Sequence, residues 1–64
     1  MTVKEAINSF VKERYCVDKF NITKIEDLGS NQWLVTVDFG DEEIALINIK
    51  KIDVGYKILC EAWI

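Results

Sequence analysis

The sequence predicts an α+β fold, in which an N-terminal helix packs on a four-stranded antiparallel meander sheet in two layers (α-β-β-β-β). Three observations predict this fold. Apolar residues recur at steps of three and four only near the N-terminus, which is typical of a helix. Further along they alternate with polar residues, and the connections are short enough for antiparallel pairing. We therefore expect residues 1–64 to form a single α+β domain.

The helix is predicted to begin after Thr2. Thr2 and Glu5 have the spacing of a capping box, in which each side chain binds the backbone N–H of the other. The apolar residues that follow share one stripe of a helix, and most charged residues fall on the other side. This stripe consists of Val3, Ala6, Ile7, Phe10 and Val11. The periodicity breaks near Tyr15, where the helix is expected to end.

Four later segments are predicted to be strands, because they alternate and are rich in the β-branched residues that favour strands. Their ranges are 20–28, 32–39, 43–51 and 54–64. Imperfect alternation around Lys24-Ile25 indicates a bulge in the first strand. Turns are expected at Gly29-Ser30-Asn31 and Gly40-Asp41, and the last connection is Lys51-Ile52-Asp53.

A single amphipathic helix covers only one face of such a sheet, and alternation decides which residues lie on each face. The face beneath the helix is expected to carry Trp33, Val35, Val37, Phe39, Tyr56, Ile58 and Cys60. The uncovered face is expected to carry Leu34, Thr36, Ile44, Leu46, Leu59 and Trp63. The third strand changes parity between Leu46 and Ile47, so a bulge that turns Leu46 inward is the alternative for that strand.

The uncovered face predicts a protein-interaction function. A solvated sheet face carries mostly polar side chains, whereas five of the six residues assigned to this face are large and apolar. We expect these six residues to bind a protein partner or a second copy of the chain, with Trp63 as the strongest contact. Pairing of edge strands into a continuous sheet is the alternative route to a dimer.

Composition excludes several other classes of function. The net charge of −3 and the single arginine argue against binding of nucleic acid. No apolar run reaches the ~20 residues that a membrane span needs, and the N-terminus lacks the apolar stretch of a secretion signal. We therefore expect a cytoplasmic protein without a membrane partner. No cofactor is expected either, because the three glycines are isolated and form no phosphate-binding loop.

Catalysis and metal binding are not expected. Histidine is absent, so Ser9, Ser30 and the two cysteines lack the base that usually activates a nucleophile. We therefore predict no enzymatic activity. Cys16 and Cys60 lie 44 positions apart without a histidine and make a poor metal site. A disulfide between them is possible, but their apolar neighbours favour two small buried side chains.

A second hypothesis rests on acidic residues near the second predicted turn. Asp38, Asp41, Glu42 and Glu43 lack the ligand spacing of a calcium loop, so a solvated acidic surface is expected there. Such a surface suits a small acidic inhibitor, of the kind that phages and mobile elements encode, that binds a basic groove of a host protein. In this alternative the four carboxylates make the contact, and the complex depends strongly on salt.

The order of elements is similar to that of cystatin-like and PepSY-type domains, in which a helix lies across an antiparallel sheet. The inhibitory loop of cystatins has a Gln-x-Val-x-Gly pattern. The nearest stretch here, Gln32-Trp33-Leu34-Val35-Thr36, departs from it at the third and fifth positions. The similarity therefore implies a topology only, and no inhibitory loop is expected.

Overall fold

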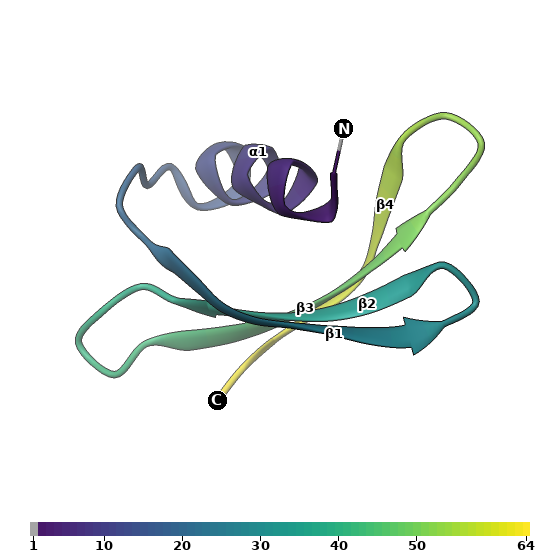
Figure 1. The fold of residues 1–64 in the computed structure, drawn as a ribbon. Coiled ribbons are helices and arrows are strands. Elements are labelled where there is room, and N and C mark those ends of the chain that lie inside the picture. The colour runs from purple at the N-terminus through teal and green to yellow at the C-terminus, as the bar shows by residue number, and fades with distance from the viewer. Residues whose placement is uncertain (1) are drawn as a thin grey trace.

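The computed structural model describes residues 2–64 and consists of one helix and one sheet (Figure 1). The elements are α1 (Val3–Tyr15), β1 (Asn21–Gly29), β2 (Gln32–Asp38), β3 (Ile44–Lys51) and β4 (Tyr56–Trp63). Each strand pairs antiparallel with the next, in the order β1-β2-β3-β4, and the sheet does not close into a barrel. The predicted α+β meander is therefore confirmed.

Helix α1 begins at the predicted capping box. The Thr2 backbone N–H donates to Glu5 Oε1 at 2.8 Å, and the Glu5 backbone N–H donates to Thr2 Oγ1 at 3.2 Å. These two bonds satisfy backbone donors that a helix start leaves unpaired. The helix ends at Tyr15, as predicted, and Cys16 follows in the left-handed conformation with φ 56°.

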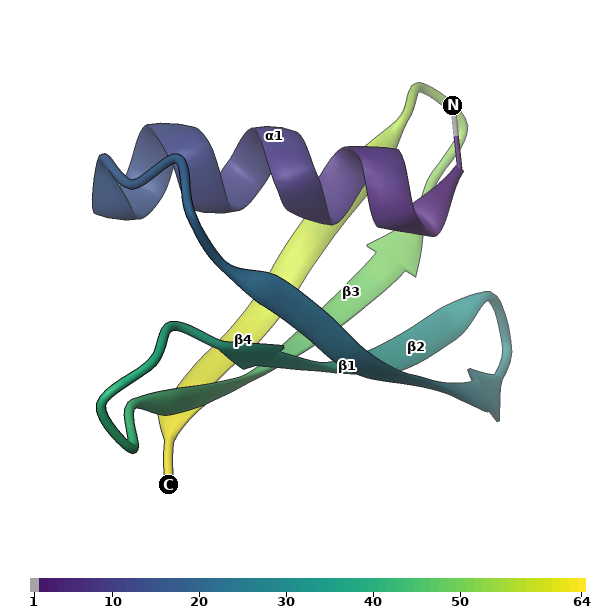
Figure 2. The ribbon, with the colours of Figure 1, turned by 60° about the vertical axis from the view of Figure 1, so that its left-hand side comes forward.

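Helix α1 lies across one face of the sheet, so that the fold has two layers (Figures 1 and 2). The predicted apolar stripe of α1 meets the central strands β2 and β3 and closes the core between the layers. The core residues that form this cluster are Ala6, Ile7, Val11, Val35, Val37, Ile47 and Ile49. All are nearly or fully buried, which is the main source of stability for a chain of this size.

The two central strands pair without any shift in register, from Gln32↔Lys50 to Asp38↔Ile44. Regular alternation therefore holds along both. In β3 the residues Ala45, Ile47 and Ile49 face the helix and are buried. The inward bulge considered for Leu46 is absent, and Leu46 lies on the face away from α1.

The outer strands are irregular. In β1 the register shifts between Ile22 and Lys24, close to the bulge predicted from the sequence, and again between Asp27 and Gly29. In β4 the register shifts once, opposite Asn48 and Ile49. An extra residue in one strand reverses the alternation relative to the partner strand, so each shift decides which side chains reach the helix. No helix in residues 2–64 is long and apolar enough to cross a membrane.

Candidate functional site

The face of the sheet that points away from α1, here called the open face, is the candidate site. Cross-strand partners lie on the same face of a sheet. Residues that alternate with the buried core residues along a strand point away from the helix. By this register the open face carries Asn21, Lys24, Glu26, Gly29, Gln32, Leu34, Thr36, Asp38, Ile44, Leu46, Asn48, Lys50, Lys57, Cys60 and Ala62. No helix in residues 2–64 covers it (Figures 1 and 2).

The middle of the open face carries apolar side chains beside the polar residues Thr36 and Asn48. Leu34, Ile44 and Leu46 come from the two central strands, and each keeps part of its side chain in contact with solvent. In β4 the exposed residues Cys60 and Ala62 continue the surface opposite Asn48 and Leu46. This group of five residues, Leu34, Ile44, Leu46, Cys60 and Ala62, is here called the apolar centre. Four of the residues predicted for the uncovered face, Leu34, Thr36, Ile44 and Leu46, lie where they were expected.

The assignment of β4 to its two faces was partly wrong. Ile58 pairs with Ile49 and Cys60 pairs with Asn48, so Leu59 is an extra residue, and 43% of it is exposed. Beyond this bulge the alternation is reversed relative to the prediction, because one residue has been added to one strand only. Cys60 therefore lies on the open face instead of beneath the helix, and Trp63, opposite Ala45, lies on the helix side.

Trp63 belongs to an aromatic cluster on the helix side rather than to the predicted partner-binding surface. Its ring centroid lies 5.5 Å from that of Tyr15 and 5.4 Å from that of Phe39. Edge-on and tilted ring pairs at such distances stabilise a fold beyond the area they bury. Trp63 thus helps to hold the end of β4 against the end of α1, although 53% of it remains exposed.

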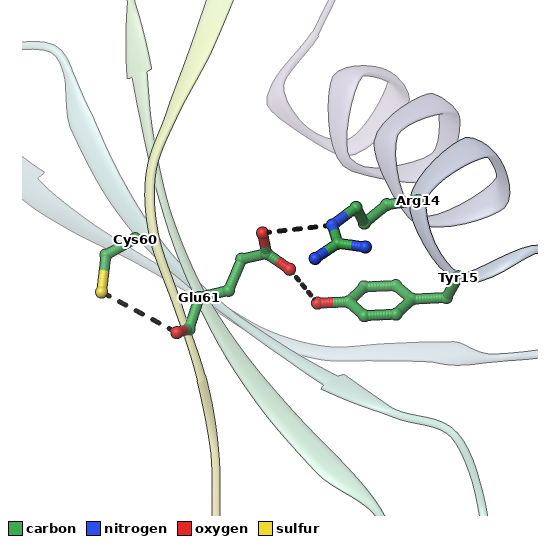
Figure 3. Close-up of polar contacts among 4 residues, drawn as sticks. All are labelled: Arg14, Tyr15, Cys60 and Glu61. Carbon is green, nitrogen blue, oxygen red and sulfur yellow. Dashed lines mark hydrogen bonds and ion pairs between the residues drawn. The ribbon is translucent and has the colours of Figure 1, made fainter.

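A polar contact beside this cluster fixes the position of α1 over β4. The Tyr15 hydroxyl donates a hydrogen bond to Glu61 Oε1, and Arg14 Nε lies 3.6 Å from Glu61 Oε2. Figure 3 shows Glu61 pointing toward the helix and the neighbouring Cys60 pointing to the other side of β4. Partial burial of the ring, together with the nearby carboxylate, raises the pKa of Tyr15 to about 12.

Asn48 is a polar residue on the open face that the sequence analysis did not single out. It lies on β3 between the apolar residues Leu34 and Cys60, its partners on the two neighbouring strands. Its Oδ1 atom is buried and has no hydrogen-bond partner among residues 2–64. A buried amide oxygen without a donor costs free energy.

Opposite charges flank the apolar centre along the strand direction. At one end Lys50 and Lys57 form a cross-strand pair, and neither ammonium group makes an ion pair within residues 2–64. At the other end Asp38 lies opposite Ile44, directly before the acidic β2–β3 turn. The pairing of Lys50 with Lys57 is visible only once the register of β4 is known, which is why the sequence did not reveal this polarity.

The four predicted acidic contacts gather at the β2–β3 turn. Asp41 and Glu42 have left-handed φ values of 53° and 64°, and both are exposed together with Glu43. Asp38 Oδ1 accepts a hydrogen bond of 2.8 Å from the Gly40 backbone N–H, which holds the turn. An open hollow of about 450 Å³ lies beside the turn. Its lining residues are Asp18, Lys19, Phe20, Asn21, Asp38, Phe39 and Gly40.

Both cysteines are exposed and free, which corrects the expectation that they are buried. Cys16 is exposed because it caps the end of α1, and Cys60 because the β4 bulge turns it outward. In the part of the chain that the structure describes, no group of three or more His, Cys, Asp or Glu side chains could hold a metal ion.

No protein-family model matches the chain, and no curated protein or solved structure matches it significantly. The candidate site therefore has to be interpreted from its own residues.

Proposed function

We propose that this chain is a small non-enzymatic protein-interaction module that binds a protein partner through the open face of its sheet. The observation that carries the proposal is the apolar centre on the face that α1 leaves uncovered. Leu46 lies beside Ile44 along β3 and diagonally across from Leu34 on β2, at positions where a purely solvated sheet face would carry polar side chains. Burial of such side chains by a partner contributes about 25 cal/mol for each Å² of apolar surface removed from water.

The surroundings of the apolar centre also support an interface. Charged side chains occupy its margins: the Lys24–Glu26 ion pair on β1, with 3.6 Å between Nζ and Oε1, and the lysines at one end. An apolar middle with a charged rim is the usual composition of a protein–protein interface. The rim remains hydrated while the middle is desolvated, so burial of Leu34 and Leu46 is expected to contribute most of the apolar free energy of binding.

Photocrosslinking tests this proposal. A benzophenone amino acid is placed at Leu46, on the open face, or at Lys12, on the exposed side of α1, as the matched control. Each protein is irradiated in purified form over a range of concentrations and in an extract of the cells that produce it. The proposal predicts a discrete crosslinked species for the Leu46 position, either a dimer or a complex with one other protein, and no such species for Lys12. Equal crosslinking from both positions, or none from Leu46, would contradict it.

The acidic β2–β3 turn favours a second candidate function, inhibition of a larger basic protein. Asp18, Lys19 and Asp38 line one hollow. The exposed residues Asp41, Glu42 and Glu43 lie beside it, so acidic side chains outnumber basic ones at this end of the molecule. Binding of a basic groove through this end would weaken steeply with added salt. A crosslink from Glu42, suppressed by salt and absent from Leu46, would favour this function over the first.

A further inference from the structure

We propose that the occupant of the open face is a second copy of this chain, packed face to face with its strands antiparallel to those of the first. This inference rests on the proposed function and names its partner. Two features carry it: the polarity of charge along the open face and the area of that face.

The charge polarity makes the open face complementary to itself. The cross-strand pair of Lys50 and Lys57 places two positive charges at one end, where they repel each other in the single chain. Asp38 and the carboxylates of Glu42 and Glu43 place negative charge at the other end. A partner that brings carboxylates to the lysines and cations to the acidic turn reduces the repulsion at both ends. A second copy of this chain can supply both, because it carries the same basic end and the same acidic end.

A two-fold axis decides the relative direction of the two copies. If the axis lies in the interface and runs across the strands, the strands become antiparallel and each basic end meets the acidic end of the other copy. If the axis runs along the strands, lysines meet lysines and carboxylates meet carboxylates. In the aligned class of face-to-face packing the strand directions stay within about 30° of one another, so these two directions are the ones to compare within that class. Charge selects the antiparallel one.

The area of the open face is sufficient for a weak dimer. Four strands at a spacing of ~4.8 Å, each of about eight residues at ~3.3 Å, make a face of roughly 500 Å² per copy. Two such faces bury about 1,000 Å² in total, which is at the lower limit for a specific interface. We therefore expect dimerisation that depends on protein concentration, with a dissociation constant in the range that sedimentation can measure.

Two charge-reversal variants test the proposal. The first combines Lys50→Glu and Lys57→Glu, and makes both ends of the open face acidic. The second combines Glu42→Lys and Glu43→Lys, and makes the turn basic while the Asp38 bond to Gly40 is kept. The matched control combines Lys4→Glu and Lys12→Glu, which reverses two exposed charges on α1 instead. Circular dichroism first establishes that all variants fold.

Sedimentation equilibrium is then measured over a range of concentrations at low and high salt. The wild-type mass should rise from 7.4 kDa toward twice that value, and less so at high salt. Each open-face variant alone should dimerise roughly tenfold or more weakly, because like charges then meet at both ends. An equimolar mixture of the two variants should recover the dimer, and the α1 control should behave as wild type.

Two results would overturn the proposal. One is a wild-type chain that stays at 7.4 kDa at every concentration. The other is a dimer that neither open-face variant weakens, which would indicate edge-strand pairing or parallel strands. A monomer that is nevertheless crosslinked from Leu46 to a different protein would overturn the claim that the occupant is a second copy, and would leave the proposed function intact. Absence of any crosslink from Leu46 would overturn both.

Discussion

The hydroxyl of Tyr15, the last residue of α1, donates a hydrogen bond to Glu61 near the C-terminal end of β4. Arg14 approaches the other oxygen of the same carboxylate, so that two consecutive helix residues hold one strand residue (Figure 3). This contact joins the end of α1 to the side of β4 that lies beneath the helix. Cys60, the neighbour of Glu61, lies on the opposite side, in the open face.

Replacement of Tyr15 by Phe should lower the free energy of unfolding by about 1 kcal/mol at pH 8, because one hydrogen bond to a charged acceptor is lost. The difference should shrink at alkaline pH. The pKa of Tyr15 is raised from 10.0 to about 12 in the folded chain, so the unfolded chain loses this proton first as the pH rises. The stabilisation from Tyr15 is therefore complete below pH 10 and is lost between pH 10 and 12.

Urea unfolding of wild type and Tyr15→Phe, measured at several pH values between 8 and 11.5, checks this prediction. Comparison of the two proteins at each pH cancels the titration of the groups they share. A difference in unfolding free energy that stays constant up to pH 11.5 would show that the hydroxyl is not held by Glu61.

Substitution of Trp63 by Leu should destabilise the fold by about 1 kcal/mol, because the ring packs against Tyr15 and Phe39. Self-association should be unaffected, since Trp63 lies on the helix side of the sheet. Val54→Ala is the control, because Val54 is 88% exposed in the β3–β4 connection and should change neither property. If Trp63→Leu instead abolished association at unchanged stability, Trp63 would have to lie on the open face and not on the helix side of β4.

Two adjacent residues of β3 should separate stability from binding. Ile47 is fully buried beneath α1, so Ile47→Val should lower the unfolding free energy by about 0.5–1.5 kcal/mol without weakening association. Leu46 lies on the open face, so Leu46→Ser should weaken association and should change the stability of dilute, monomeric protein less. Denaturant unfolding and sedimentation of both variants check this. The reverse pattern would show that Leu46, not Ile47, belongs to the core.

Local signals in the sequence predicted much of the fold. The capping box of Thr2 and Glu5 depends on residues three positions apart, and the apolar stripe of α1 on one helical face. In β2 uninterrupted alternation predicted which residues reach the helix, because β2 pairs with β3 without a shift. The same alternation placed Leu34 on the open face, whereas the adjacent apolar residues Leu46 and Ile47 left the facing of β3 open until its pairing with β2 was known.

The faces of β4 could not be predicted because they depend on a bulge. Its apolar residues alternate without interruption along the sequence, so nothing local indicates that Leu59 is an extra residue. The bulge exists only in the pairing with β3, which brings together residues far apart in the chain. For the same reason the exposure of Cys60 and the pairing of Lys50 with Lys57 became visible only in the structure.

Alkylation of the two native cysteines tests the role of the open face most directly. Both are exposed and free, but Cys60 lies in the apolar centre, whereas Cys16 caps α1 and serves as the control within the same chain. The ratio of their rates of reaction with iodoacetamide is followed by mass spectrometry as the concentration of the purified protein is raised. We expect Cys60 to become protected while Cys16 keeps its rate. A ratio that stays constant at every concentration, and also in an extract of the producing cells, would contradict binding at this face.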